Sequence, residues 1–123
     1  MNLVDSSGWL EYFVDGKNAG KFAAAIEDTE RLIVSTLNIY EVYKKVIEER
    51  DEDAALEAVA MMQQARVIEV TSSIAIQAAK FSYIFKIPLA DSIIYITTIE
   101  NNAVVWTQDA DFKGMEGVEY FPL

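Results

Sequence analysis

Short apolar runs alternate with longer segments of helical periodicity along the chain, and this alternation most constrains the fold. The apolar runs are continuous rather than interrupted at every second position, and they cover 2–4, 31–35, 66–70, 103–107 and a short edge strand at 118–121. Parallel strands covered by helices on both faces have this character, whereas strands with one solvated face alternate. We therefore predict an α/β fold of three layers, with a mainly parallel sheet between helices.

Residues that favour helix starts precede the segments of helical periodicity. Side chains of Ser, Thr, Asp and Asn accept hydrogen bonds from the free N–H groups of a first turn. We expect helices over 6–13, 18–28, a long segment ending near Arg50, the segment after Asp51 or Asp53, 72–85, and 88 to about 101, with Ala55, Leu56, Val59 and Met62 facing inward in the fourth. The other candidate caps are Ser6 or Ser7, Thr36 or Asn38, and Ser72 or Ser73, and Pro88 suits the first turn of the last helix.

Composition and length indicate one folded domain over 1–123. The chain has 123 residues, of which 52% are hydrophobic and 24% charged, as in an ordinary globular protein with one core. No apolar run reaches the roughly 18 residues needed to span a bilayer, and no basic region followed by an apolar stretch opens the chain. A cytoplasmic protein without membrane contact is the expectation.

Five acids interrupt or follow apolar segments. Asp5 follows the first predicted strand, Glu41 lies inside an apolar stretch, and Asp91 lies in the first turns of an apolar helix. Asp109 and Asp111 follow the strand at 103–107. Because the carboxyl ends of parallel strands meet at one edge of a sheet, the fold can bring these acids together.

Each acid alone has an ordinary structural role available to it. Asp5 suits a helix cap, Glu41 a solvated helix position, and Asp91 the positive end of its helix. Asp109 and Asp111 suit turns, where Asp is common. Together, however, four segments place acids near the same predicted edge, where like charges repel and raise one another's pKa unless a cation neutralises them.

The absence of His and Cys restricts the chemistry of such a site. No thiolate or imidazole ligand exists in the chain, and no Ser-His-Asp triad can form. Carboxylate oxygens suit Mg²⁺ or Mn²⁺. Clustered carboxylates with such an ion activate water and stabilise charge on a phosphate, which is the chemistry of phosphodiester hydrolysis.

The net charge of −10, from 20 acids and 10 basic residues, bears on partners. It argues against a nonspecific nucleic-acid binder with a broad basic surface and favours a basic protein partner. The non-enzymatic alternative is an acidic module that binds a basic peptide. A receiver-like phosphotransfer domain is disfavoured because it needs an aspartate at the end of a mid-chain strand, whereas the strand 66–70 is followed by Thr71. A haloacid-dehalogenase-like phosphatase is disfavoured because it needs Asp-x-Asp after the first strand, whereas Asp5 is followed by Ser6-Ser7.

Four short motifs resemble those of PIN-domain nucleases, in the same order and spacing. They are Val4-Asp5-Ser6-Ser7, Asn38-Ile39-Tyr40-Glu41-Val42, Leu89-Ala90-Asp91-Ser92-Ile93-Ile94-Tyr95 and Thr107-Gln108-Asp109-Ala110-Asp111-Phe112. The resemblance covers essentially the whole chain. Its compact length is similar to that of the VapC-type toxins of bacterial and archaeal toxin–antitoxin pairs.

The resemblance implies a PIN-like fold, a Mg²⁺- or Mn²⁺-dependent endoribonuclease acting on RNA, a homodimer, and inhibition by a cognate VapB-like antitoxin. Asp5, Glu41, Asp91 and Asp109 fall on the catalytic, metal-binding acidic quartet of the family, and Asp111 on an additional acid. Asp5 and Asp91 are then the expected direct metal ligands. Ser6 and Thr107 match hydroxylic positions beside the acids, where they would orient the carboxylates.

Overall fold

A computed structural model describes all residues 1–123 and confirms the α/β fold. Its five strands are β1 (Asn2–Val4), β2 (Leu32–Ser35), β3 (Arg66–Ile68), β4 (Val104–Thr107) and β5 (Val118–Tyr120). They form one sheet in the order β3-β2-β1-β4-β5, and every neighbouring pair is parallel. β1 is the central strand, with β2 and β4 on either side.

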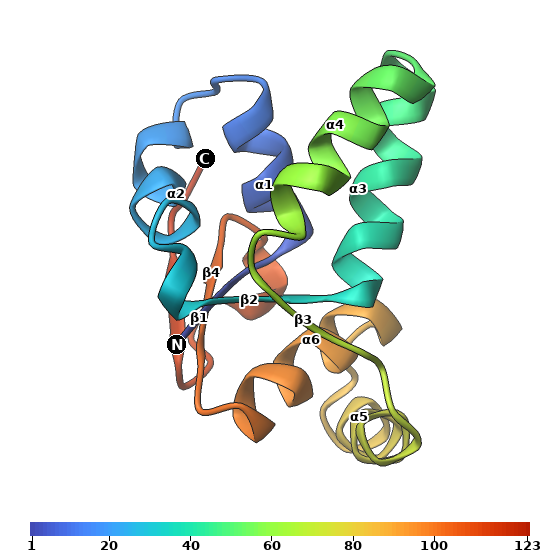
Figure 1. Ribbon diagram of the computed structural model, residues 1–123. Helices are drawn as coiled ribbons and strands as arrows, with labels where there is room; N and C mark the ends of the chain where they lie inside the picture. The colour runs from blue at the N-terminus through green and yellow to red at the C-terminus, as the bar shows by residue number, and fades with distance from the viewer.

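The chain has six α-helices, and helices lie on both sides of the sheet (Figure 1). They are α1 (Ser6–Phe13), α2 (Ala19–Ile26), α3 (Thr36–Glu49), α4 (Glu52–Met62), α5 (Ser72–Phe85) and α6 (Leu89–Glu100), with 3₁₀ turns at Thr29–Arg31 and Ala110–Phe112. In Figure 1, α1 to α4 lie above the strands, and α6 and α5 lie below. None of these helices combines the length and apolar character needed to cross a membrane.

The continuous apolar strands serve two cores, one on each face of the sheet. Val4 and Val34 belong to the core that contains α1 to α4, whereas Leu3 and Ile33 belong to the core that contains α6. Successive side chains of a strand point to opposite faces, so a strand covered on both faces needs apolar residues at every position. α5 is placed differently: its buried Ile74 and Ala78 pack on Ile96 of α6.

Several helix starts differ from the sequence prediction by one residue. Asp5 caps α1 in place of Ser6 or Ser7, and Thr71 caps α5 in place of Ser72 or Ser73. Ser35 caps α3, and the side chain of Asn38 completes the capping box by accepting from the Ser35 backbone N–H. In each case the last residue of extended backbone supplies the cap, since a capping residue needs extended rather than helical dihedral angles.

Three further details of the helices bear on the prediction. Of the two predicted caps of α4, Asp51 and Asp53, the structure has Asp51. Leu56 does not face inward as the periodicity predicts: it is 51% exposed, and Ala58 is buried in its place. Pro88 immediately precedes α6 instead of lying in its first turn, which leaves Asp91 in that turn.

Gly8 allows α1 to approach β1 and α2 closely. A Cβ atom at Gly8 would lie 2.6 Å from Cγ1 of Val4 and 2.7 Å from Cε1 of Phe22. Both neighbours are fully buried, so neither side chain can move aside without disturbing the core. At Gly20 in α2, by contrast, a Cβ would meet nothing within 4 Å.

We predict opposite effects of alanine at these two helical glycines. Gly8→Ala should lower the free energy of unfolding by about 1–3 kcal/mol through overpacking. Gly20→Ala should raise it by about 0.5–1 kcal/mol, because alanine loses less conformational entropy in a helix. Urea denaturation of the two variants measures both effects, and an unchanged midpoint for Gly8→Ala would contradict the close packing of α1.

Candidate metal centre

The fold brings the predicted acids to the carboxyl edge of the sheet. Asp5 directly follows the central strand β1, and Asp109 follows the neighbouring strand β4. Glu41 lies in the second turn of α3, the helix that begins where β2 ends. Asp91 lies in the first turn of α6, whose N-terminus faces this edge because the helix runs back toward the start of β4.

Asp5 is the buried member of the set, with only 4% of its surface exposed. Its Oδ1 accepts hydrogen bonds from the Ser7 hydroxyl at 2.7 Å and the Gly8 N–H at 3.2 Å, and its Oδ2 accepts from the Thr107 hydroxyl at 2.9 Å. Burial raises the pKa of Asp5 to about 6, these hydrogen bonds oppose the rise, and the charge of Asp109 adds to it. Three donors thus hold the Asp5 carboxylate, which leaves acceptor capacity for a cation, and no positively charged side chain faces it.

Asp91, Asp109 and Asp111 form a close group of carboxylates. One oxygen from each lies within 4.8 Å of the others, a spacing that can hold a metal ion. Burial raises the pKa of Asp91 to about 8, with further contributions from a hydrogen bond to Asp111 and from the charges of Asp109, Asp111 and Asp5. These four aspartates therefore interact electrostatically as one site.

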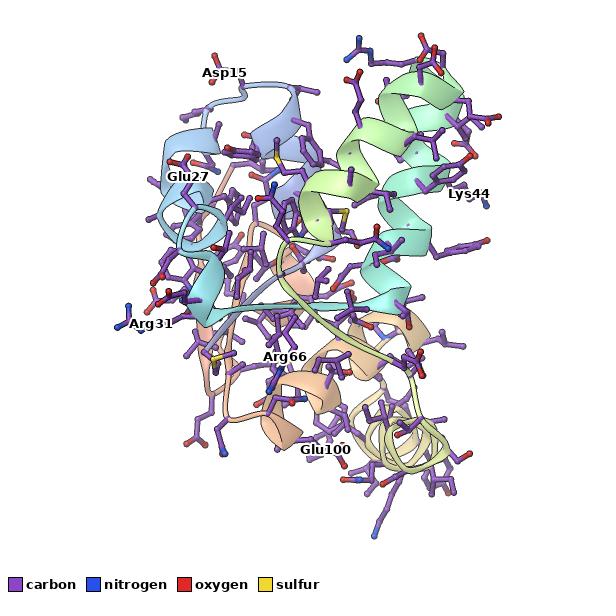
Figure 2. The ribbon with its side chains drawn as sticks, in the orientation of Figure 1. Asp15, Glu27, Arg31, Lys44, Arg66 and Glu100 are labelled. Carbon is purple, nitrogen blue, oxygen red and sulfur yellow. The ribbon has the colours of Figure 1, made fainter.

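No basic side chain forms an ion pair with the acids of this site. The two ion pairs of the structure join Arg31 to Asp28 and Lys45 to Glu49. Figure 2 shows Arg31, Lys44 and Arg66 on separate parts of the surface rather than gathered at one place. The site must therefore take up protons or a cation to balance its charge.

Glu41 stands beside this group rather than in it. Its Oε1 accepts a hydrogen bond from the Ser6 hydroxyl at 2.7 Å, and Ser6 follows Asp5 in the chain. Glu41 is half-buried and is not among the three carboxylates that lie within 4.8 Å of one another. A ligand shared by Asp91 and Glu41 would thus lie between the group and α3.

The hydroxyl side chains expected beside the acids do contact them. Ser6 donates to Glu41, and Thr107 donates to Asp5. Two further contacts were not assigned from the sequence: Ser7 donates to Asp5, and the buried Asn38 donates from Nδ2 to the Ser6 Oγ at 3.2 Å. The available signals were the Ser-Ser pair after a strand-end aspartate and the spacing of Asn38 one helical turn before Glu41.

A groove of about 550 Å³ runs between α1, α3 and α4 and reaches the acidic edge at Ser7 and Gln108. Its apolar lining comes from all three helices and includes Leu10, Phe13, Val46, Ala58 and Met61. Phe13 stacks on Trp9 with ring centroids 5.7 Å apart, but Trp9 itself is fully buried. Of the aromatic residues of α1, only Phe13 lines the groove, and Trp9 belongs to the core.

We predict that the metal-free protein loses stability as pH rises from about 4 to 8. The pKa values of Asp5 and Asp91 lie near 6 and 8 in the folded state, above the ordinary value of 3.8. Between these limits the folded state binds more protons than the unfolded state, so the stability present at low pH is lost as the two carboxyls ionise. Thermal unfolding in a chelator, measured across this pH range, tests the sign.

Asp91→Asn supplies the comparison for this pH series. An uncharged amide removes the ionisation near pH 8, so the variant should be more stable than wild type at pH 8 without metal and should lose less stability as pH rises. Added Mg²⁺ or Mn²⁺ should stabilise wild type at pH 8 and not the variant. Identical pH dependence of wild type and Asp91→Asn would show that this carboxyl is not perturbed.

Comparisons with known proteins place this geometry in a family. The family model of the PIN domain matches residues 3–118. No curated protein matches the chain significantly.

Among solved structures, the fold is similar to a chain of a toxin–antitoxin complex from Klebsiella pneumoniae, with a TM-score of 0.80 and 19% identity over 100% of both chains. It is also similar to VapC20 of Mycobacterium tuberculosis, a toxin that cleaves the sarcin–ricin loop, with a TM-score of 0.82 and 18% identity over 99% of this chain and 100% of that one. DNA-bound VapBC from Salmonella typhimurium gives a TM-score of 0.75 at 14% identity, over 99% of this chain and 98% of that one. These structures share the fold, and the family match covers nearly the whole sequence: the chain belongs to the PIN-domain family.

Proposed function

We propose that this chain is a metal-dependent endoribonuclease toxin that hydrolyses RNA phosphodiester bonds in the cytoplasm. The observation that carries the proposal is the gathering of Asp5, Asp91, Asp109 and Asp111 at one sheet edge with no basic partner. Membership of the PIN-domain family supports it. The likeness to VapC20, a sarcin–ricin loop-cleaving toxin, supports RNA as the substrate.

The donor set fits Mg²⁺ or Mn²⁺. All candidate ligand atoms are carboxylate oxygens, which these hard cations prefer, and burial with like charge makes the site favour a cation. Asp5 and Asp91 would bind the ion directly, Glu41 and Asp109 through water, and Asp111 would serve as an additional acid. The ion supplies an activated water and stabilises the charge that develops on the phosphate.

The protein's own part is to hold these carboxylates in place and to leave one side open. Asp5 is fixed by three donors, whereas Asp109 and Asp111 lie at the more exposed rim where a phosphate can approach. Asp109 Oδ1 accepts from the N–H of Asp111 at 2.9 Å, which fixes the turn that carries both acids. Rigid placement of ligands of this kind supplies orientation at no cost during the reaction.

The direct test is cleavage of RNA by the purified chain with Mg²⁺ or Mn²⁺. Asp91→Asn should reduce the cleavage rate by more than about 100-fold, because it removes a ligand charge from the site. Asp53→Asn, which makes the same change at an exposed position of α4, should cleave like wild type.

Two outcomes would contradict the proposal. Cleavage that persists in a chelator would exclude the metal, and equal rates for wild type and Asp91→Asn would exclude the assigned site. Tight binding of a basic peptide without cleavage of any RNA would favour the alternative, an acidic binding module, which the net charge of −10 also suits.

We further propose that a cognate VapB-like antitoxin inhibits the enzyme by occupying the groove between α1, α3 and α4. The groove combines an apolar lining with an end at Ser7 and Gln108, beside the acidic site, so an occupant would also block the approach of RNA. The toxin–antitoxin complexes among the similar structures support a partner of this kind. The product of any small reading frame found directly upstream of this gene would be the candidate to test.

Substitutions at two exposed apolar residues of α4 distinguish a loss of antitoxin binding in the groove from a general loss of structure. Met61 lines the groove, whereas Leu56 is exposed outside it. We expect Met61→Asp to weaken antitoxin binding at least tenfold, about 1.4 kcal/mol, and Leu56→Asp to leave it unchanged, with RNA cleavage intact in both. Equal affinity of the two variants, measured by calorimetry, would place the antitoxin elsewhere.

The homodimer is also a proposal. Helix α5 exposes the large apolar side chains of Ile76, Tyr83, Ile84 and Phe85, and several such side chains exposed on one helix suit a protein interface. We propose that a second copy of the chain packs against these side chains of α5. Sedimentation of the purified protein distinguishes a dimer from a monomer.

A further inference from the structure

Asn38 has an unambiguous orientation in the structure. It is fully buried, and its Oδ1 accepts from the backbone N–H of Ser35 at 3.0 Å. A backbone N–H can only donate, so the oxygen of the amide must face Ser35. The Nδ2 of Asn38 therefore faces Ser6, where it lies 3.2 Å from the Oγ.

This orientation fixes the direction of the next hydrogen bond. An amide NH₂ can only donate, so the Ser6 Oγ accepts from Asn38 and keeps its single hydrogen for another partner. That partner is Oε1 of Glu41, at 2.7 Å. The chain of bonds from Ser35 through Asn38 and Ser6 to Glu41 therefore runs in one direction.

The same arrangement occurs twice on Asp5. The Thr107 Oγ1 accepts from the N–H of Asp109 at 2.8 Å and donates to Oδ2 of Asp5 at 2.9 Å. The Ser7 Oγ lies 3.5 Å from the N–H of Gln108 and donates to Oδ1 of Asp5 at 2.7 Å. In all three cases a group that can only donate occupies one side of a hydroxyl, and a carboxylate occupies the other.

We propose that Asn38 and Ser7 are positioning residues that hold Glu41 and Asp5 as fixed hydrogen-bond acceptors facing the metal site. Without Asn38, the Ser6 hydroxyl is free to rotate and to donate elsewhere than to Glu41. Without Ser7, the Asp5 carboxylate loses a short, charge-assisted bond. Neither residue has to touch the metal or the RNA. The inference rests on the proposed function, since it concerns how the same acids bind an ion.

The test is the Mn²⁺ dissociation constant of the RNA-free protein, measured by calorimetry for wild type and single variants. Ser6→Ala, Ser7→Ala and Asn38→Leu should each raise the dissociation constant about tenfold, the usual scale for groups that orient ligands. Ser35→Ala is the control. It removes the other half of the α3 cap, the bond from the Leu37 N–H to the Ser35 Oγ, and should lower stability without changing Mn²⁺ binding.

A double variant separates positioning from general loss of structure. If Asn38 acts through Ser6, Asn38→Leu combined with Ser6→Ala should bind Mn²⁺ no more weakly than Ser6→Ala alone. Additive losses would overturn the route through Ser6. If Asn38→Leu does not fold, Ser7→Ala still tests the same arrangement on Asp5.

The proposed function and the positioning role fail in different ways. Wild type that neither binds Mn²⁺ nor cleaves RNA overturns both. Wild type that binds and cleaves, with Mn²⁺ affinities unchanged within twofold in Ser6→Ala, Ser7→Ala and Asn38→Leu, overturns the positioning role alone. A tenfold loss in these variants, with none in Ser35→Ala, supports it.

Discussion

The buried carboxylate of Asp5 is the constraint on which the rest of the site depends. It stands at the end of the central strand with only 4% of its surface exposed, where an ion is costly unless surrounded by donors. Its donors come from the start of α1 and the end of β4, so satisfying this carboxylate also aligns a helix with a neighbouring strand. Gly8 contributes twice, by donating its N–H and by letting α1 approach β1.

Most of the fold could be predicted from the sequence because strands covered on both faces of the sheet are apolar at successive positions. Strands such as Leu32–Ser35 are buried at every position, and a short apolar run without polar alternation is typical of a strand covered on both faces. The errors were local. Leu56 is apolar and correctly spaced, but α4 packs through the smaller Ala55 and Ala58, which allow close approach to α3. Such a choice depends on the distance between helices, which periodicity does not contain.

The candidate site was predicted in part, and the division has a physical cause. The carboxyl ends of parallel strands meet at one edge of the sheet, so the position of Asp5 and Asp109 after strands predicts that they lie close together. The direction of the hydrogen bonds could not be predicted from the sequence, because Asn38 and Ser6 lie 32 positions apart and meet only after β1 and β2 pair. The groove could not be predicted from the sequence either, since its lining comes from three helices and its exposed residues resemble ordinary surface residues.

The central claim is that these carboxylates form a divalent metal site. Anomalous diffraction from crystals soaked in Mn²⁺ tests it most directly, because the signal locates the ion without reference to activity. We predict one or two peaks bounded by Asp5, Asp91 and Asp109, with carboxylate oxygens of Asp5 and Asp91 about 2.0–2.3 Å from an ion. No peak at this edge, or ions only at other acids such as those at the start of α4, would contradict it.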